Sequence, residues 1–203
     1  MGKRIYIVPD WMRGQPVPEG RTPLYLNPGL TFGTGAHPTT QLCLELLEEV
    51  LQPGDKVLDL GCGSGILAIA ALSLGASRAV GVDIDPKAAD VAFENAALNG
   101  IGPGRLSVYA GDVLTDKKLA ARLGPGENQV VLANIVADVI IPLSGAAGAL
   151  MAPGGVFLTS GIIDGRLDEV RAALERSGFT VTRHLERGGW HAFRAERRTG
   201  GAR

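Results

Sequence analysis

Short apolar runs alternate with longer amphipathic segments along most of the chain. Five runs have the length of buried strands and are bounded by turn residues: 57–60, 79–83, 106–110, 129–134 and 156–160. Between and beside them, apolar residues recur at helical spacing in the segments 38–51, 66–74, 86–98, 139–151 and 167–177. This alternation predicts an α/β fold in which helices cover both faces of a mostly parallel sheet.

Two further strands are predicted near the end of the chain, at 179–184 and 190–195. The link between them is too short for a helix, so we expect an antiparallel hairpin at one edge of the sheet. Together with the five runs above, these strands would make a seven-stranded sheet.

The chain is expected to divide into three parts. Residues 1–36 are rich in Pro and Gly, carry β-like pieces at 5–8 and 23–26, and are interpreted as an N-terminal arm and lid loop. Residues 37–195 form the α/β domain, which is the expected catalytic domain. Residues 196–203 are a basic tail that is expected to be disordered.

The strand predicted at 57–60 runs directly into Gly61, Gly63 and Gly65, three glycines at alternate positions. Glycine allows positive φ and lets a ligand approach the main chain closely, and the helix that follows would point its N-terminus at the same place. In an open parallel sheet, ligands bind beyond the carboxyl ends of the strands. The predicted ends carry Gly61, Asp83, Asp112 and Asn134.

The spacing of Asp83 narrows the class of ligand. It follows Gly61 by 22 residues, the placement at which a carboxylate accepts hydrogen bonds from the hydroxyls of a ribose. The dinucleotide pattern Gly-x-Gly-x-x-Gly is not met, because Gly65 comes one position early and Ile66 follows it. The pattern therefore indicates a nucleoside ligand and disfavours a pyrophosphate.

The stretch 59–65, Asp-Leu-Gly-Cys-Gly-Ser-Gly, resembles motif I of class I S-adenosylmethionine-dependent methyltransferases. A more specific element is Phe-Gly-Thr-Gly-Ala-His-Pro-Thr-Thr at 32–40, joined by Gly-Val-Asp-Ile-Asp-Pro at 81–86 and Ala-Asn-Ile-Val at 133–136. Together these elements resemble the ribosomal protein L11 methyltransferase family, over nearly the whole chain. The resemblance implies a Rossmann-like fold with S-adenosylmethionine as cofactor.

Carried over onto this sequence, the family's cofactor contacts fall on Thr40, Gly61, Asp83 and Asn134. The motif I turn, with Gly63, would hold the methionine end of the cofactor. Asp59 would orient its ammonium, and Asp112 would approach the adenine amino group. The family's activity is N-methylation of lysine side chains and of an N-terminal amine on a large-subunit ribosomal protein.

Each of these residues also has a simpler interpretation. Thr40 can cap a helix, Asp59 and Asp112 can cap loops, and Asn134 can form a turn after its strand. His37 can act as a general base or brace its loop, and we do not assign it as catalytic. His184 and His191 are expected to be structural.

Three aromatic residues, Trp11, Phe32 and Trp190, can either pack or surround a sulfonium, and the motif favours Phe32.

The residues after Asn134 bear on the methyl acceptor. Enzymes that methylate planar nitrogens typically follow this position with Pro-Pro and an aromatic ring, whereas here Ile135, Val136 and Ala137 follow. An aliphatic amine needs no stacking surface, so it is the favoured acceptor, and Asn134 is a possible amine-positioning residue. No residue marks itself as the catalytic base, which leaves proton loss to water open.

Composition excludes several other classes of function. With 20 Lys and Arg against 21 Asp and Glu, no broad surface for DNA is indicated. No apolar run is long enough for a membrane span and no secretory leader is visible, so a cytoplasmic location is the expectation. Cys43 and Cys62 suit reduced thiols and make no metal site.

Family members usually place a substrate-recognition domain before the catalytic one, whereas here a 36-residue arm precedes it. The methyl acceptor therefore stays open. One alternative is a methyltransferase of the same fold that acts on another protein, RNA or a small molecule. The others are a nucleotide-binding oxidoreductase and a non-catalytic cofactor sensor.

Overall fold

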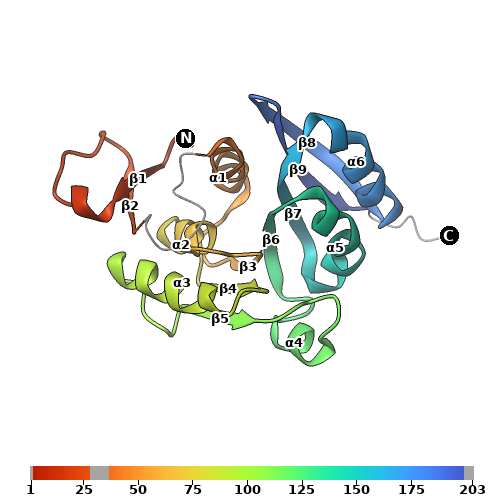
Figure 1. Cartoon of the computed structure of the whole chain (residues 1–203), viewed down its shortest axis with the longest axis horizontal. Helices are drawn as coiled ribbons and strands as arrows, with labels where there is room; N and C mark the ends of the chain where they lie inside the picture. Colours follow the sequence, from red (N-terminus) through yellow and green to blue (C-terminus); the bar gives the residue numbers. More distant parts are fainter. Residues whose placement is uncertain (1, 28–36, 199–203) are drawn as a thin grey trace.

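The computed structural model describes residues 2–27 and 37–198. Its main sheet has seven strands in the order β5-β4-β3-β6-β7-β9-β8 (Figure 1). The strands are β3 (Lys56–Leu60), β4 (Arg78–Asp83), β5 (Leu106–Ala110), β6 (Asn128–Asn134), β7 (Met151–Ile163), β8 (Phe179–Arg187) and β9 (Trp190–Arg197). The pairs from β5 to β7 are parallel, and β9 pairs antiparallel with both β7 and β8. The predicted sheet and its edge hairpin are therefore confirmed.

Helices cover both faces of this sheet (Figure 1). They are α1 (Pro38–Val50), α2 (Ile66–Ser73), α3 (Lys87–Leu98), α4 (Lys117–Arg122), α5 (Ala137–Leu150) and α6 (Leu167–Arg176). Because side chains alternate along a strand, neighbouring residues enter different cores. Val57 belongs to the core that includes residues of α1 and α2, whereas Leu58 belongs to the core that includes residues of α4, α5 and α6.

Three details differ from the sequence prediction. Helix α4 is short and buries one apolar side chain, Leu119, so the sequence shows no apolar period that would predict it. The helix begins after Asp116, whose side chain caps it. Strand β7 starts at Met151, before the expected Pro153–Gly155 turn, which is taken into the strand with a register irregularity. Strand β9 continues to Arg197, so residues 196 and 197 belong to a strand and not to the tail.

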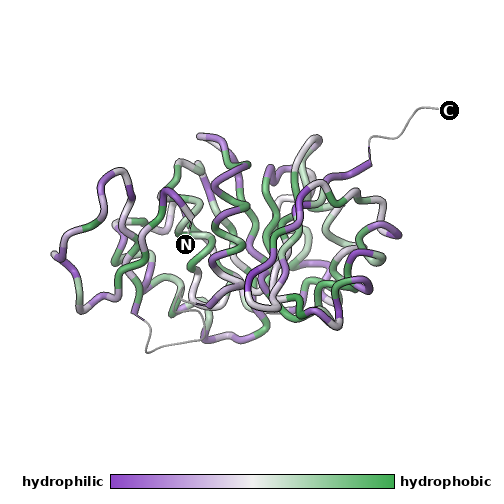
Figure 2. The backbone as a smooth tube through the Cα atoms, turned by 90° about the horizontal axis from the view of Figure 1, so that it is seen from above, coloured by the Kyte–Doolittle hydropathy of each residue, from purple (hydrophilic) through white to green (hydrophobic). Residues whose placement is uncertain are grey.

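The N-terminal arm forms a small sheet of its own. Strands β1 (Ile5–Pro9) and β2 (Thr22–Leu26) pair in parallel, and the turn η1 (Asp10–Met12) follows β1. Buried Ile5 and Leu24 join the core beneath α1 and α2. In Figure 2 the loop between β1 and β2 is largely hydrophilic, while hydrophobic segments run through the middle of the molecule. Of the segment 1–36 predicted as arm and lid loop, residues 28–36 lie outside the described residues.

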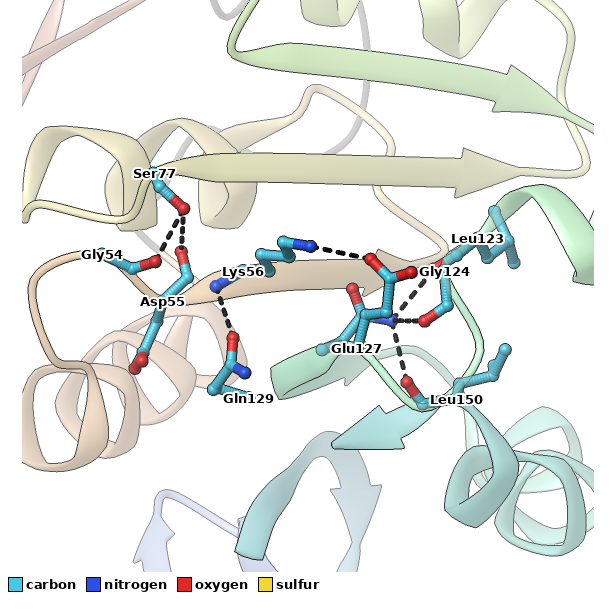
Figure 3. Close-up of polar contacts among 10 residues, drawn as sticks. Gly54, Asp55, Lys56, Ser77, Leu123, Gly124, Glu127, Gln129 and Leu150 are labelled. Carbon is cyan, nitrogen blue, oxygen red and sulfur yellow. Dashed lines mark hydrogen bonds and ion pairs between the residues drawn. The ribbon is translucent and has the colours of Figure 1, made fainter. Parts of the chain in front are cut away.

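The amino ends of the strands are held by polar contacts at the edge opposite the glycine turn (Figure 3). Lys56 Nζ lies 2.7 Å from Glu127 Oε2. The buried Asn128 amide donates to the carbonyls of Leu123, Gly124 and Leu150 at 2.8–2.9 Å.

None of the described helices is long and apolar enough to cross a membrane.

Candidate active site

A cavity of about 620 Å³ lies at the carboxyl ends of β3, β4 and β6, beside the loop that follows β5. It is the place at which an open parallel sheet binds ligands. All six residues predicted to contact a cofactor line it: Thr40, Gly61, Gly63, Asp83, Asp112 and Asn134. Residues far apart in the sequence are thus brought to one site.

The glycine turn has the backbone that its sequence predicts. Gly61, Gly63 and Gly65 have φ values of 74°, 48° and 75°, in the left-handed region that favours glycine. A Cβ at Gly61 would lie 2.5 Å from Ile135 Cγ2, so a side chain there would also collide with the neighbouring strand end. The three glycines therefore leave the main chain of the turn unobstructed by side chains at these positions.

Asp83 joins the turn to the end of β4. Its carboxylate accepts hydrogen bonds from Gly63 N at 2.8 Å and from Asp85 N at 3.0 Å. Two oxygens offer about four acceptor positions, so the carboxylate keeps capacity for the hydroxyls of a ligand in the cavity. The structure thus shows that Asp83 braces the turn, and its contact with a ribose stays a prediction.

Two buried polar atoms at this turn have no hydrogen-bond partner among the described residues: Asp59 Oδ1 and Ser64 Oγ. Both residues line the cavity and are at most 5% exposed. The other Asp59 oxygen accepts from Ala68 N at 3.2 Å. Desolvation raises the pKa of Asp59 to about 7, with a further contribution from the charge of Asp83. A cationic ligand group beside Asp59 would offset this cost of burial.

The N-terminus of α1 lies against the ends of β6 and β7. Asn134 Nδ2 donates to Thr40 Oγ1 at 3.4 Å, across 94 residues of sequence. Beside it, Ser160 Oγ donates to the Thr39 carbonyl at 3.0 Å. These contacts hold the Thr40 and Asn134 side chains together at the cavity wall, and their contact with a cofactor stays a prediction.

His37 caps α1, and its Nδ1 lies 2.9 Å from Thr39 Oγ1 and 3.4 Å from Thr39 N. His37 therefore braces its loop, which is one of the two roles that the sequence left open. Its ring also packs edge-on against Trp190, with 4.9 Å between the ring centroids, and both rings line the cavity. Trp11, by contrast, is 72% exposed and does not line the cavity. Phe32 lies outside the described residues.

Comparison with known proteins agrees with this geometry. The family profile described as "Ribosomal protein L11 methyltransferase (PrmA)" matches residues 1–198. The chain belongs to this family. A ribosomal protein L11 methyltransferase of Pseudomonas aeruginosa is 46% identical over 197 residues, which is 97% of this chain and 63% of the relative. The chain therefore spans less than two thirds of the length of its curated relatives.

Solved structures agree with the assignment to the L11 methyltransferase family. The ribosomal protein L11 methylase of Lactobacillus delbrueckii subsp. bulgaricus superposes with a TM-score of 0.86 at 33% identity, covering 97% of this chain and 96% of the other. A putative methyltransferase solved in complex with SAH superposes with a TM-score of 0.66 at 13% identity, covering 80% of this chain and 50% of the other. This second match shows the shared fold alone.

Asp112, His184 and His191 all have partners within the protein in this L11-methyltransferase-like structure. The Asp112 carboxylate accepts from Leu114 N at 2.8 Å and from Thr115 Oγ1 at 3.0 Å. These bonds are the loop-capping role that the sequence left open, and contact with an adenine stays a prediction. His184 and His191 do not line the cavity and are structural, as expected: His184 Nε2 lies 2.9 Å from His191 Nδ1, and His191 Nε2 lies 2.7 Å from Asp164.

Two residues that line the cavity, Ser64 and Gly161, are not among the predicted site residues. Ser64 lines the cavity, and its buried hydroxyl has no hydrogen-bond partner among the described residues. Gly161 has φ of 89°, and a Cβ there would lie 2.3 Å from the Ile135 carbonyl oxygen. It lets β7 pass close to the segment after Asn134. The available signal in the sequence was a glycine directly after the predicted strand 156–160. Cys43 and Cys62 are free thiols, and both are buried.

Proposed function

We propose that this chain is the catalytic domain of an S-adenosylmethionine-dependent N-methyltransferase that acts on ribosomal protein L11, in the cytoplasm where ribosomal proteins are made. The observation that carries the proposal is the pair of buried, unpartnered polar atoms, Asp59 Oδ1 and Ser64 Oγ, at a glycine turn in a 620 Å³ cavity. Family membership supports the same activity.

The residues present suit this cofactor at each of its parts. Asp59 would face the ammonium, and Ser64 and the bare turn would face the carboxylate, since a hydroxyl and backbone amides bind anions. Asp83 would accept from the ribose hydroxyls. Exposed apolar side chains beside it, Ile84 and Leu114, line the cavity and suit the faces of a purine.

Asn134 would position the acceptor amine. Its amide nitrogen donates to Thr40 Oγ1, which leaves its carbonyl oxygen to accept a hydrogen bond from an amine in the cavity. S-adenosylmethionine supplies an activated sulfonium methyl, so alignment of the attacking nitrogen contributes much of the rate. The amine must first lose a proton, because only the neutral form has a lone pair. We propose that water takes it at the cavity mouth.

Trp190 bears on whether the methyl acceptor is an aliphatic amine or a planar nitrogen. The absence of a ring after Asn134 favoured an aliphatic amine over a planar acceptor. Trp190 supplies a ring to the same cavity from β9, so the missing ring does not separate the two classes. Membership of the L11 methyltransferase family therefore carries the choice of an amine on a large-subunit ribosomal protein.

The test is transfer of labelled methyl from S-adenosylmethionine to purified ribosomal protein L11, to total RNA and to lysine peptides. Labelled L11, with the label on amines by peptide mass spectrometry, is the expected result. Labelling of RNA alone would overturn the proposed substrate. Binding of the cofactor with no transfer to any acceptor would indicate a sensor.

A further inference from the structure

One face of α3 contacts both the glycine turn and the N-terminal arm. Ala92, Asn95 and Asn99 follow one another at intervals of three and four residues, which places them on one side of the helix. A Cβ at Gly65 would lie 2.8 Å from Ala92 Cβ, so the helix and the turn are in close contact. A displacement of the glycine turn would therefore displace this face of α3 as well.

Asn95 bridges the two parts with one buried amide. Its Nδ2 donates to the Ser64 carbonyl at 2.9 Å, and its Oδ1 accepts from Asn27 N, just after β2, at 2.9 Å. The side chain is fully buried. A buried amide that loses one partner bears the full cost of desolvation, so each bond favours the geometry that preserves the other.

Asn99 holds the arm without touching the turn. Its Oδ1 accepts from Tyr25 N at 2.8 Å, and its Nδ2 donates to the Tyr25 carbonyl at 2.7 Å. Asn99 thus pairs with the edge of β2 as a neighbouring strand would. Its Nδ2 also donates to the Asn95 carbonyl at 2.7 Å. It provides a matched control, because its loss weakens the arm contact and leaves both side-chain bonds of Asn95 in place.

Ser64 lies at the turn end of the bridge through Asn95. Its carbonyl accepts from Asn95 Nδ2, while its buried hydroxyl has no hydrogen-bond partner among the described residues, and the residue lines the cavity. We propose that Asn95 is a positioning residue that couples the N-terminal arm to the cofactor turn, so that the arm contact at Asn27 and cofactor binding strengthen one another. This inference rests on the proposed function, because it takes S-adenosylmethionine as the ligand of the turn.

Coupling of this kind is reciprocal and can be measured from either side. The experiment uses the full chain and S-adenosylhomocysteine as the probe. Calorimetry gives its Kd, and site-resolved hydrogen exchange follows the Asn27 amide with and without ligand. In the wild type, saturating ligand should slow exchange of this amide by about fivefold, the lower end of typical coupling.

The Asn95→Ala variant should remove this ligand-dependent slowing and weaken binding by about fivefold. The Asn99→Ala variant should speed exchange in the arm but keep the slowing by ligand. If Asn95→Ala does not fold, Asn95→Ser, whose hydroxyl is too short to bridge, takes its place. A purely structural residue would change exchange equally with and without ligand.

Two outcomes would overturn the inference: a wild-type Asn27 amide that does not respond to bound ligand, or an equal response in the wild type and the Asn95 variant. Failure of the wild type to bind S-adenosylhomocysteine at all would instead count against the proposed function.

Discussion

Cofactor binding should release a proton from Asp59. In the free protein, burial raises the pKa of Asp59 to about 7, and one carboxylate oxygen has no partner among the described residues. A bound ammonium would stabilise the ionised form and lower this pKa. Because the free protein then holds a proton that the complex does not, affinity should rise with pH below about 7 and level off above it.

The expected size of the effect follows from linkage. With a pKa near 7 in the free protein and at least two units lower in the complex, about 0.8 to 0.9 of a proton leaves on binding at pH 6, and the Kd for S-adenosylhomocysteine is about tenfold weaker at pH 6 than at pH 8. Calorimetry in two buffers with different ionisation enthalpies measures the number of protons released.

The matched control is Asp59→Asn, which keeps the shape and removes the titration. This variant should bind more weakly and lose this pH dependence. The difference in pH dependence between wild type and variant then gives the contribution of Asp59 apart from His37 and Asp83, which line the same cavity. Binding to the wild type at pH 6 without proton release would refute the reasoning.

Three further predictions concern single residues. Asp83→Ala should weaken cofactor binding by about 1–3 kcal/mol in calorimetry, as for lost charge-assisted hydrogen bonds; an unchanged Kd would remove Asp83 from the site. Asn134→Ala should lower kcat at saturating cofactor by about tenfold or more through loss of alignment, and normal turnover would return Asn134 to a turn-forming role. Gly161→Ala should lower the free energy of unfolding by about 1–3 kcal/mol in urea titrations, because its positive φ and its contact with the Ile135 carbonyl are both unfavourable to a side chain. Its control is Gly145→Ala within α5, where a Cβ meets nothing within 4 Å and the helix should gain about 0.5–1 kcal/mol.

The sheet and the position of the site could be predicted from local sequence. Buried strands that end in Gly61, Asp83 and Asn134 carry their own signal, because the carboxyl ends of parallel strands meet at one edge. The contact between Thr40 and Asn134 could be expected only from the family motifs, since nothing in either segment alone indicates the other.

Other features depend on tertiary packing and leave little trace in the sequence. The raised pKa of Asp59 arises from burial under α2, and the bridge through Asn95 depends on where the arm lies against α3. Helix α4 buries one residue, Leu119, so it has no apolar period to detect. The division into arm, catalytic domain and tail stays a prediction, apart from the extension of β9 to Arg197.

The most direct test of the account is methylation of ribosomal protein L11 by this chain, followed by mass spectrometry of the product. We predict mass increases of whole methyl groups on lysine or N-terminal amines, dependent on S-adenosylmethionine and strongly reduced in Asn134→Ala. Unmodified L11 after incubation with an enzyme shown to bind the cofactor would contradict the proposed substrate.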